Sequence, residues 1–255
     1  MKNNLSGIFN LKTIIITVSS VISTAICIRL NITAKFPDFL IGIAIVFPVV
    51  FSISSAFGRR EFALQRLSEF KGHLISLYFA AKDWPTDKAN NHLHKKVANE
   101  IKEIMTLLKL MLKDKNTWKE NEKKMYWHFG NISFQISEMR QLGVQSGEIS
   151  RVNQYVSKII IAFDNLRFIC MYRTPFSLRA FSKVFIFSFP VLYAPYFAAI
   201  SKDYSFQLIY IMPVLYSLIL MSLHNVQENL ENPFDGKGSD DVFINLEEEL
   251  NMLEK

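Results

Sequence analysis

The stretch Glu228-Asn229-Leu230-Glu231-Asn232-Pro233-Phe234-Asp235 decides the fold, because a long apolar run ends here and a tail rich in carboxylates begins. Proline cannot continue a helix, and it biases the residue before it toward extended backbone. Asn232 and Pro233 therefore predict the end of a helix and a turn of the chain back along the molecule. We expect Glu231, Asn232, Pro233 and Phe234 to form this structural motif, within an acidic tail over residues 231–255.

The composition indicates that part of the chain lies in lipid. Of the 255 residues, 50% are hydrophobic, and 22 are Phe against 9 Gly and 8 Pro, which is more apolar mass than a soluble domain of this size usually buries. The net charge is +6, but the basic residues are scattered, and no zinc-finger, RNA-binding or helix-turn-helix signature accompanies them. Membrane topology explains the charge better than a nucleic-acid partner does.

Four apolar segments are candidate membrane spans. A helix needs roughly 20 apolar residues to cross the hydrocarbon core, and the segments that approach this length are residues 13–30, 39–57, 181–200 and 206–223. A cleaved signal peptide is the alternative for the first one, but the run is long, no small-residue cleavage site follows, and a second span comes directly after it. Pro48 lies within the second, where neighbouring helices can satisfy the freed carbonyl.

Charge placement predicts the topology. The short polar link 201–205 joins the last two spans into a hairpin. Lys and Arg accumulate on the cytoplasmic side of membrane proteins, and the basic residues that flank the spans here are Arg59, Arg60, Arg173, Arg179 and Lys183. We therefore expect a multi-pass protein of the inner or plasma membrane, with the middle region and both termini in the cytoplasm.

The polar region 58–180 is expected to be a set of cytoplasmic helices. The second span should continue into it without a break, and breaks are expected at residues 84–87 and 142–147. Spacings of three and four predict an amphipathic helix with an apolar stripe made of Val97, Ile101, Ile104, Leu108 and Met111. No internal repeat or low-complexity tract is visible, so the simplest prediction is one domain over residues 1–255.

The order of these elements, together with local motifs, resembles the bestrophin family of pentameric ion channels. The resemblance rests on the Glu231–Phe234 exit, on Arg173-Thr174-Pro175-Phe176-Ser177-Leu178 before the third span, and on Arg66-Leu67-Ser68-Glu69, where the family has Arg-Trp-Trp-Glu. The paired tryptophans are replaced by Leu67 and Ser68. The resemblance implies an all-α, four-span homopentamer that binds membrane lipids and small inorganic ions.

In bestrophins the second span lines the pore and narrows it with an apolar column. The residues that match this column by type and place are Val49, Ile53 and Phe57, at i, i+4 and i+8. Several copies would form a hydrophobic neck that opens by wetting. The alternatives are that these side chains face lipid or another helix, or that the neck uses the neighbouring register of Phe47 and Phe51.

Serines in the same span are candidates for a wider vestibule. Ser52, Ser54 and Ser55 could offer hydroxyls to a partly dehydrated ion. A membrane serine more often bonds back to its own helix, and this alternative stays open.

The tail offers carboxylates that could hold calcium. Asp235, Asp240 and Asp241 are separated by glycines that permit a tight turn, but the spacing is not that of an EF-hand, and the tail carries less acid than the calcium clasp of animal bestrophins. A solvated tail that packs against the basic region is the favoured alternative. We therefore predict no cofactor, with calcium as the alternative that stays open. No other metal site is expected, since Cys27 and Cys170 lie far apart in apolar stretches.

The function that these observations predict is ion conduction. No nucleophile elbow, phosphate-binding glycine loop or HExxH motif is present, so an enzyme is not expected. An apolar neck carries no charge that would set selectivity, and the basic middle region favours chloride or other anions. The alternatives are a cation channel of the same fold, or a membrane scaffold that recruits partners without conducting.

Overall fold

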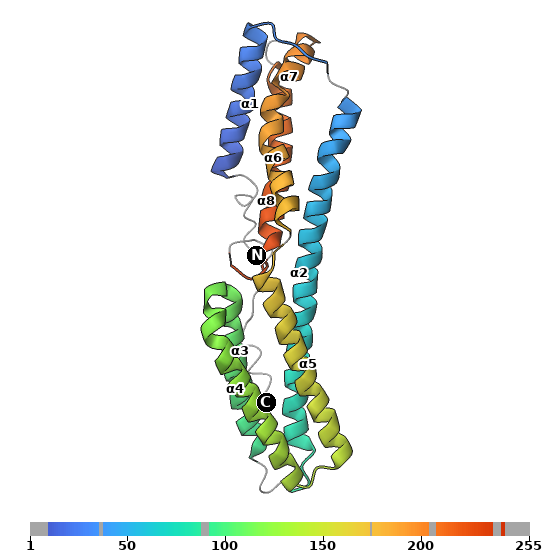
Figure 1. The fold of residues 1–255 in the computed structure, drawn as a ribbon, viewed down its shortest axis with the longest axis vertical. Coiled ribbons are helices and arrows are strands. Elements are labelled where there is room, and N and C mark those ends of the chain that lie inside the picture. The colour runs from blue at the N-terminus through green and yellow to red at the C-terminus, as the bar shows by residue number, and fades with distance from the viewer. Residues whose placement is uncertain are drawn as a thin grey trace. The chain divides into compact units, whose positions relative to one another are not determined.

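The structure, a computed structural model, describes residues 10–35, 38–87, 92–173, 175–203, 208–236 and 241–242, without the side chains of residues 38–46 and 203. Within these ranges the regular structure is entirely helical, which confirms the predicted all-α fold (Figure 1). The elements are α1 (Leu11–Arg29), α2 (Asp38–Asp83), α3 (Leu93–Lys113), η2 (Lys115–Thr117), α4 (Trp118–Gln141), α5 (Ser146–Met171), α6 (Phe176–Leu192), α7 (Ala194–Ile200), η3 (Ser201–Asp203) and α8 (Ile211–Glu231).

The chain divides into two compact units. Unit 1 comprises the described residues of Met1–Arg60, Arg173–Pro233 and Lys237–Asp241. Unit 2 comprises those of Glu61–Tyr172, Phe234–Gly236 and Val242–Lys255. Helix α2 contributes to both, and its 46 residues confirm that the second predicted span continues past Gly58 without a break. The division lies close to residue 58, where we expected the cytoplasmic region to begin.

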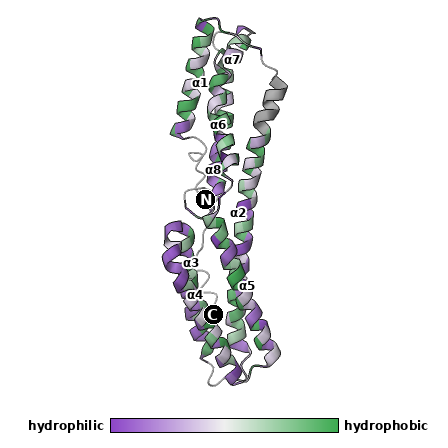
Figure 2. Ribbon diagram, viewed as in Figure 1, coloured by the Kyte–Doolittle hydropathy of each residue, from purple (hydrophilic) through white to green (hydrophobic). Residues whose placement is uncertain are grey.

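In unit 1, helix α1 lies beside α6, α7 and α8. Unlike a helix of a soluble protein, it buries polar residues and exposes apolar ones. Its buried residues are Thr13, Ser20 and Thr24. Its exposed residues include the large aliphatic side chains Ile14, Ile15, Val18, Ile22 and Ile26. The ribbon of α1 is largely in the hydrophobic colour in Figure 2. A helix in water hides its apolar stripe, so an outward apolar face suits lipid or another protein chain better than water.

Two helical stretches are long and apolar enough to cross a membrane, as judged by length and composition: Leu11–Arg29 and Ser146–Leu192, which contains α5 and α6. The four-span topology stays a prediction. The third predicted span, 181–200, is divided at Tyr193 into α6 and α7, and Pro195 lies in the first turn of α7, where its missing N–H is not needed. Helix α8 extends beyond the predicted end at residue 223 to Glu231.

Unit 2 has an apolar core to which α2, α3, α4 and α5 all contribute. The predicted stripe of α3 is confirmed, since each of its members is buried: Val97, Ile101, Ile104, Leu108 and Met111. An aromatic group from α4 and α5 joins this core, with Trp118 stacked on Phe163 at 5.5 Å and Phe129 edge-on to Phe163 at 5.7 Å between ring centroids. Burying each such side chain stabilises the fold by about 1.5–3 kcal/mol.

The two predicted breaks in unit 2 are confirmed, and they contact each other. Helix α2 ends at Asp83 and α4 ends at Gln141. Thr86 donates from both its backbone N–H and its hydroxyl to the Leu142 carbonyl, at 3.1 Å and 3.0 Å. Gly143 follows with φ +82°, a left-handed conformation that glycine adopts at little cost.

Candidate functional site

Helix α2 presents two different faces within unit 1. The inner face consists of small or compact residues, Val49, Ser52 and Ala56, which are 2%, 0% and 1% exposed. Val49 packs in one cluster with Ile186 of α6 and with Leu220 and Met221 of α8. This face therefore holds α2 against its own protomer.

Burial within the protomer differs among the neck and vestibule candidates on α2. Val49 faces α6 and α8 and is 2% exposed, and Ser52 is fully buried, so neither side chain is open to the outside of a single protomer. Ile53 is half-buried against the same cluster, whereas Phe57, Ser54 and Ser55 are exposed. The neck and vestibule assignments all remain predictions.

The outer face of α2 carries large apolar side chains. Phe47, Val50 and Phe51 are 55%, 54% and 62% exposed, and the rings of Phe47 and Phe51 lie 6.1 Å apart between centroids. Ser54 and Gly58 follow on the same face at i+7 and i+11 from Phe47. Exposure thus favours the neighbouring register of Phe47 and Phe51. The signal available in the sequence was the small residues Ser52 and Ala56 at i and i+4, which mark a face that packs closely against other helices.

A polar seam fixes α1 to α8. The Asn10 amide donates to the Asn225 side-chain oxygen at 2.9 Å, and the Asn225 amide donates to the Thr13 hydroxyl oxygen at 3.2 Å. Higher on α1, the Ser20 hydroxyl donates to the Pro190 carbonyl of α6 at 2.7 Å. Hydrogen bonds of this kind hold helices together where lipid removes the hydrophobic drive for association.

Ion pairs gather at the C-terminal end of α8. The Glu228 carboxylate lies 3.0 Å from the Lys183 ammonium, 3.7 Å from that of Lys12 and 3.5 Å from the His224 ring. One turn further, Glu231 lies 3.2 Å from Arg179 of α6. Glu231, the first residue of the predicted motif, therefore ties the end of α8 to the start of α6.

The rest of that motif marks the passage of the chain from unit 1 to unit 2. Asn232 is half-buried and Pro233 is buried, both directly after the end of α8. Phe234 is 7% exposed and belongs to the apolar core of unit 2. A hollow of about 360 Å³ lies beside Phe234, between the end of α3 and Val242. The geometry is that of a buried anchor followed by a turn, in which Gly236 has φ +72°.

The two calcium candidates that the structure describes belong to different units. Asp235 is half-buried beside the hollow in unit 2, Asp241 is buried and belongs to unit 1, and Asp240 lies outside the described residues. Among the residues that the structure describes, no group of three His, Cys, Asp or Glu side chains is arranged to hold a metal.

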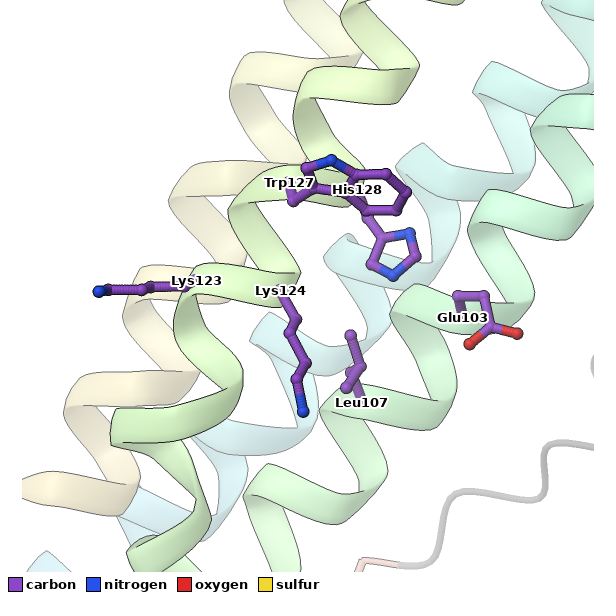
Figure 3. Close-up of a pocket in the computed structure, with 6 residues that line it drawn as sticks. All are labelled: Glu103, Leu107, Lys123, Lys124, Trp127 and His128. Carbon is purple, nitrogen blue, oxygen red and sulfur yellow. The ribbon is translucent and has the colours of Figure 1, made fainter.

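Unit 2 also has an open groove between α3 and α4, of about 450 Å³ (Figure 3). It is lined by Glu103, Leu107, Lys123, Lys124, Trp127 and His128, and Lys123 points away from the other five. The His128 Nδ1 atom lies 2.6 Å from Glu100, and Lys124 reaches Glu120 at 3.4 Å. His128 and Lys124 are therefore each paired with a carboxylate that lies outside the lining of the groove.

Comparison with known proteins supports this geometry at the level of the fold. No family model and no curated protein matches the sequence. Two point-mutant structures of a bacterial bestrophin homologue from Klebsiella pneumoniae superpose with a TM-score of 0.78, at 18% and 17% identity, each covering 95% of this chain and 96% of theirs. The chain has the bestrophin fold. A third structure, of a membrane protein variant, covers 96% of this chain at 17% identity and the same TM-score.

Proposed function

We propose that this chain is a bestrophin-like channel for small monovalent ions, in which the outer face of α2 lines the conducting path of a homopentamer. The observation that carries the proposal is the pair of faces on α2: a compact inner face fixed to α6 and α8, and an outer face of large apolar residues that its own protomer leaves uncovered. The bestrophin fold over 95% of the chain supports it.

Assembly follows from this geometry. A path lined by one helix per subunit requires several copies around an axis, and closed cyclic symmetry is the usual arrangement for identical chains. The outer face of α2 then faces the axis and is shielded from both lipid and bulk water. The resemblance to bestrophins supplies the number of subunits.

The neck is assigned to Phe47, Val50 and Phe51. Their exposed side chains lie within one turn of α2, where copies from each subunit would form a dry ring. Such a constriction gates by wetting and drying and blocks ions without any charge. Ser54 and Ser55, both exposed, would line the wider path on its cytoplasmic side.

Planar-bilayer recording of the purified protein tests this proposal against a non-conducting scaffold. Unitary currents are expected, and they should change with Phe51→Ala. The matched control is Phe176→Ala, since Phe176 is an exposed aromatic residue of α6 outside the proposed path. Absent currents would refute the proposed channel, and currents that respond equally to the two substitutions would refute the assignment of Phe51 to the path.

A further inference from the structure

A set of buried polar side chains lies one helical turn from the apolar cluster of unit 1. That cluster joins Val49 of α2 to Ile186 of α6 and to Leu220 and Met221 of α8. Helices α2 and α8 run in the same direction, and α6 runs in the opposite direction (Figure 1). One turn further toward the C-terminal end of α8, the three helices carry Ser52, Ser182 and His224, which we call the polar layer.

Contacts between α6 and α8 place Ser182 and His224 at the same level of the bundle. The His224 ring lies edge-on to the Phe187 ring, with 5.1 Å between centroids. The ammonium of Lys183, the residue after Ser182, lies 3.0 Å from the Glu228 carboxylate, one turn after His224. Successive turns of the two antiparallel helices are therefore paired across the polar layer.

Ser52 joins this level from α2. It lies between Val49 and Ile53 in the chain, and both of these residues pack with the apolar cluster. Ser52 and Ser182 are 0% exposed and His224 is 1% exposed. The polar layer is thus closed off from the surface of the protomer.

The side chains of the polar layer have no hydrogen-bond partner among the residues that the structure describes. This holds for the hydroxyl oxygens of Ser52 and Ser182 and for both ring nitrogens of His224. The Glu228 carboxylate lies 3.5 Å from Nε2 of His224 without completing a hydrogen bond. Four polar atoms are therefore buried at one level without a bond.

Other serines of unit 1 are equally buried and are bonded. The Ser20 hydroxyl donates to the Pro190 carbonyl at 2.7 Å, and the Ser217 hydroxyl donates to the Pro213 carbonyl at 2.6 Å. The second bond is the usual one for a helical serine, which reaches back one turn along its own helix. The serines of the polar layer do not make this bond, so their hydroxyls are left to bond across the bundle.

Water is the ligand that suits this set of atoms. Burying a polar group without a partner is unfavourable, and buried waters commonly satisfy such groups. A hydroxyl both donates and accepts, and a neutral imidazole has one nitrogen of each kind, which matches the two donors and two acceptors of water. The charge beside the layer is already compensated, since Glu228 lies near both Lys183 and Lys12. An ion of either sign is therefore not required.

We propose that Ser52, Ser182 and His224 form a binding site for buried water that links α2 to α6 and α8. The water supplies the hydrogen bonds that these side chains do not make with one another. This inference goes beyond the proposed function, because it concerns how α2 is held within one protomer and does not depend on conduction.

Melting temperatures of Ser52→Ala and Ser182→Ala, measured on the whole chain in detergent, test the proposal by their sign. If each hydroxyl bonds a buried water, each substitution should lower the melting temperature by about 2–4 °C. If the hydroxyls are buried without any partner, their removal should leave the melting temperature unchanged or raise it, because an unsatisfied polar group is lost.

A double-mutant cycle tests whether the two serines share the site. The double variant of Ser52 and Ser182 should lose less than the sum of the two single losses, because both hydroxyls bond the same water. The matched control is Ser217→Ala, which removes an equally buried hydroxyl that is bonded to its own helix. Its effect should add to that of Ser52→Ala.

The outcomes decide the proposal. Unchanged or raised melting temperatures overturn the water site, and strictly additive losses overturn its sharing by the two serines. Losses that appear in KCl and vanish when both ions are replaced by large organic ions assign the site to an ion and also overturn the proposal. A high-resolution structure should show water density between the three side chains, and its absence there would contradict the site independently of stability.

Discussion

Single residues carry much of the local specificity of unit 2, and the junction between its two turns is the clearest case. Gly143 has φ +82°, and a Cβ at this position would meet the Thr86 hydroxyl oxygen, which donates to Leu142. Glycine is therefore required twice over, by backbone conformation and by the close approach of a second loop.

Gly143→Ala should lower the free energy of unfolding by about 1–3 kcal/mol, because alanine is strained at positive φ and must displace Thr86. The matched control is Gly147→Ala in the first turn of α5, where a Cβ meets no atom within 4 Å. Thermal denaturation of the two variants checks this. Equal stability of both would show that the junction tolerates a side chain.

His73, on the part of α2 that belongs to unit 2, should give this unit a pH dependence. Burial first, and then the nearby Lys158, lower the pKa of His73 from 6.5, while Glu69 opposes the shift. The ring stacks on Tyr155 with 6.1 Å between centroids. A pKa lowered by folding means that the folded unit binds the proton less well than the unfolded chain.

The stability contributed by neutral His73 should therefore be present above pH 6.5 and be lost as the pH falls through the folded pKa. Melting temperatures of the wild type and of His73→Gln, compared between about pH 7.5 and 5.5, measure this contribution. The substituted protein should lose less stability on acidification. Parallel curves would assign the pH dependence to other groups.

At the scale of elements, the register of α2 decides whether Phe51 or Phe57 belongs to the proposed neck. Phe51 lies on the outer face and Phe57 on its flank, and both are more than half exposed. Phe51→Ala should raise single-channel conductance or open probability, since a smaller side chain widens the neck and lowers the cost of wetting. Phe57→Ala, the original sequence-based candidate, should change the current less. The reverse order would return the neck to the register of Phe57.

The helices themselves could be predicted from the sequence, because their stops are local: Pro85 follows the end of α2, and Gly143 follows the end of α4. The amphipathic stripe of α3 could be predicted because its other face is polar. The face of α2 that its own protomer leaves exposed could not be predicted in this way. Val49 and Phe51 are both apolar, and they differ only in whether α6 and α8 pack against them. That information is tertiary, and the sequence indicates it only through the small residues Ser52 and Ala56, which are spaced four apart.

At the scale of the whole molecule, the exposed apolar residues on α2 predict that the protomer is not the functional state. Detergent-solubilised protein should have the mass of a pentamer, measured by light scattering or native mass spectrometry, because a path lined by one helix per subunit needs a closed ring. A stable monomer or dimer that still conducts would contradict this assembly.

Helix α1 buries polar residues and exposes apolar ones, and this arrangement determines which substitutions the helix should tolerate. Its inward hydroxyls, Thr13, Ser20 and Thr24, hold positions where a larger aliphatic residue would separate α1 from its neighbours. Its outward residues, such as Ile15 and Ile22, would face lipid tails in a membrane, and fluid lipid tails can accommodate apolar side chains of different shapes. In a deep mutational scan, tolerance to substitution along this helix should therefore be the reverse of that in a soluble protein. The exposed apolar positions should accept many other apolar residues, and the buried small polar positions should accept few substitutions.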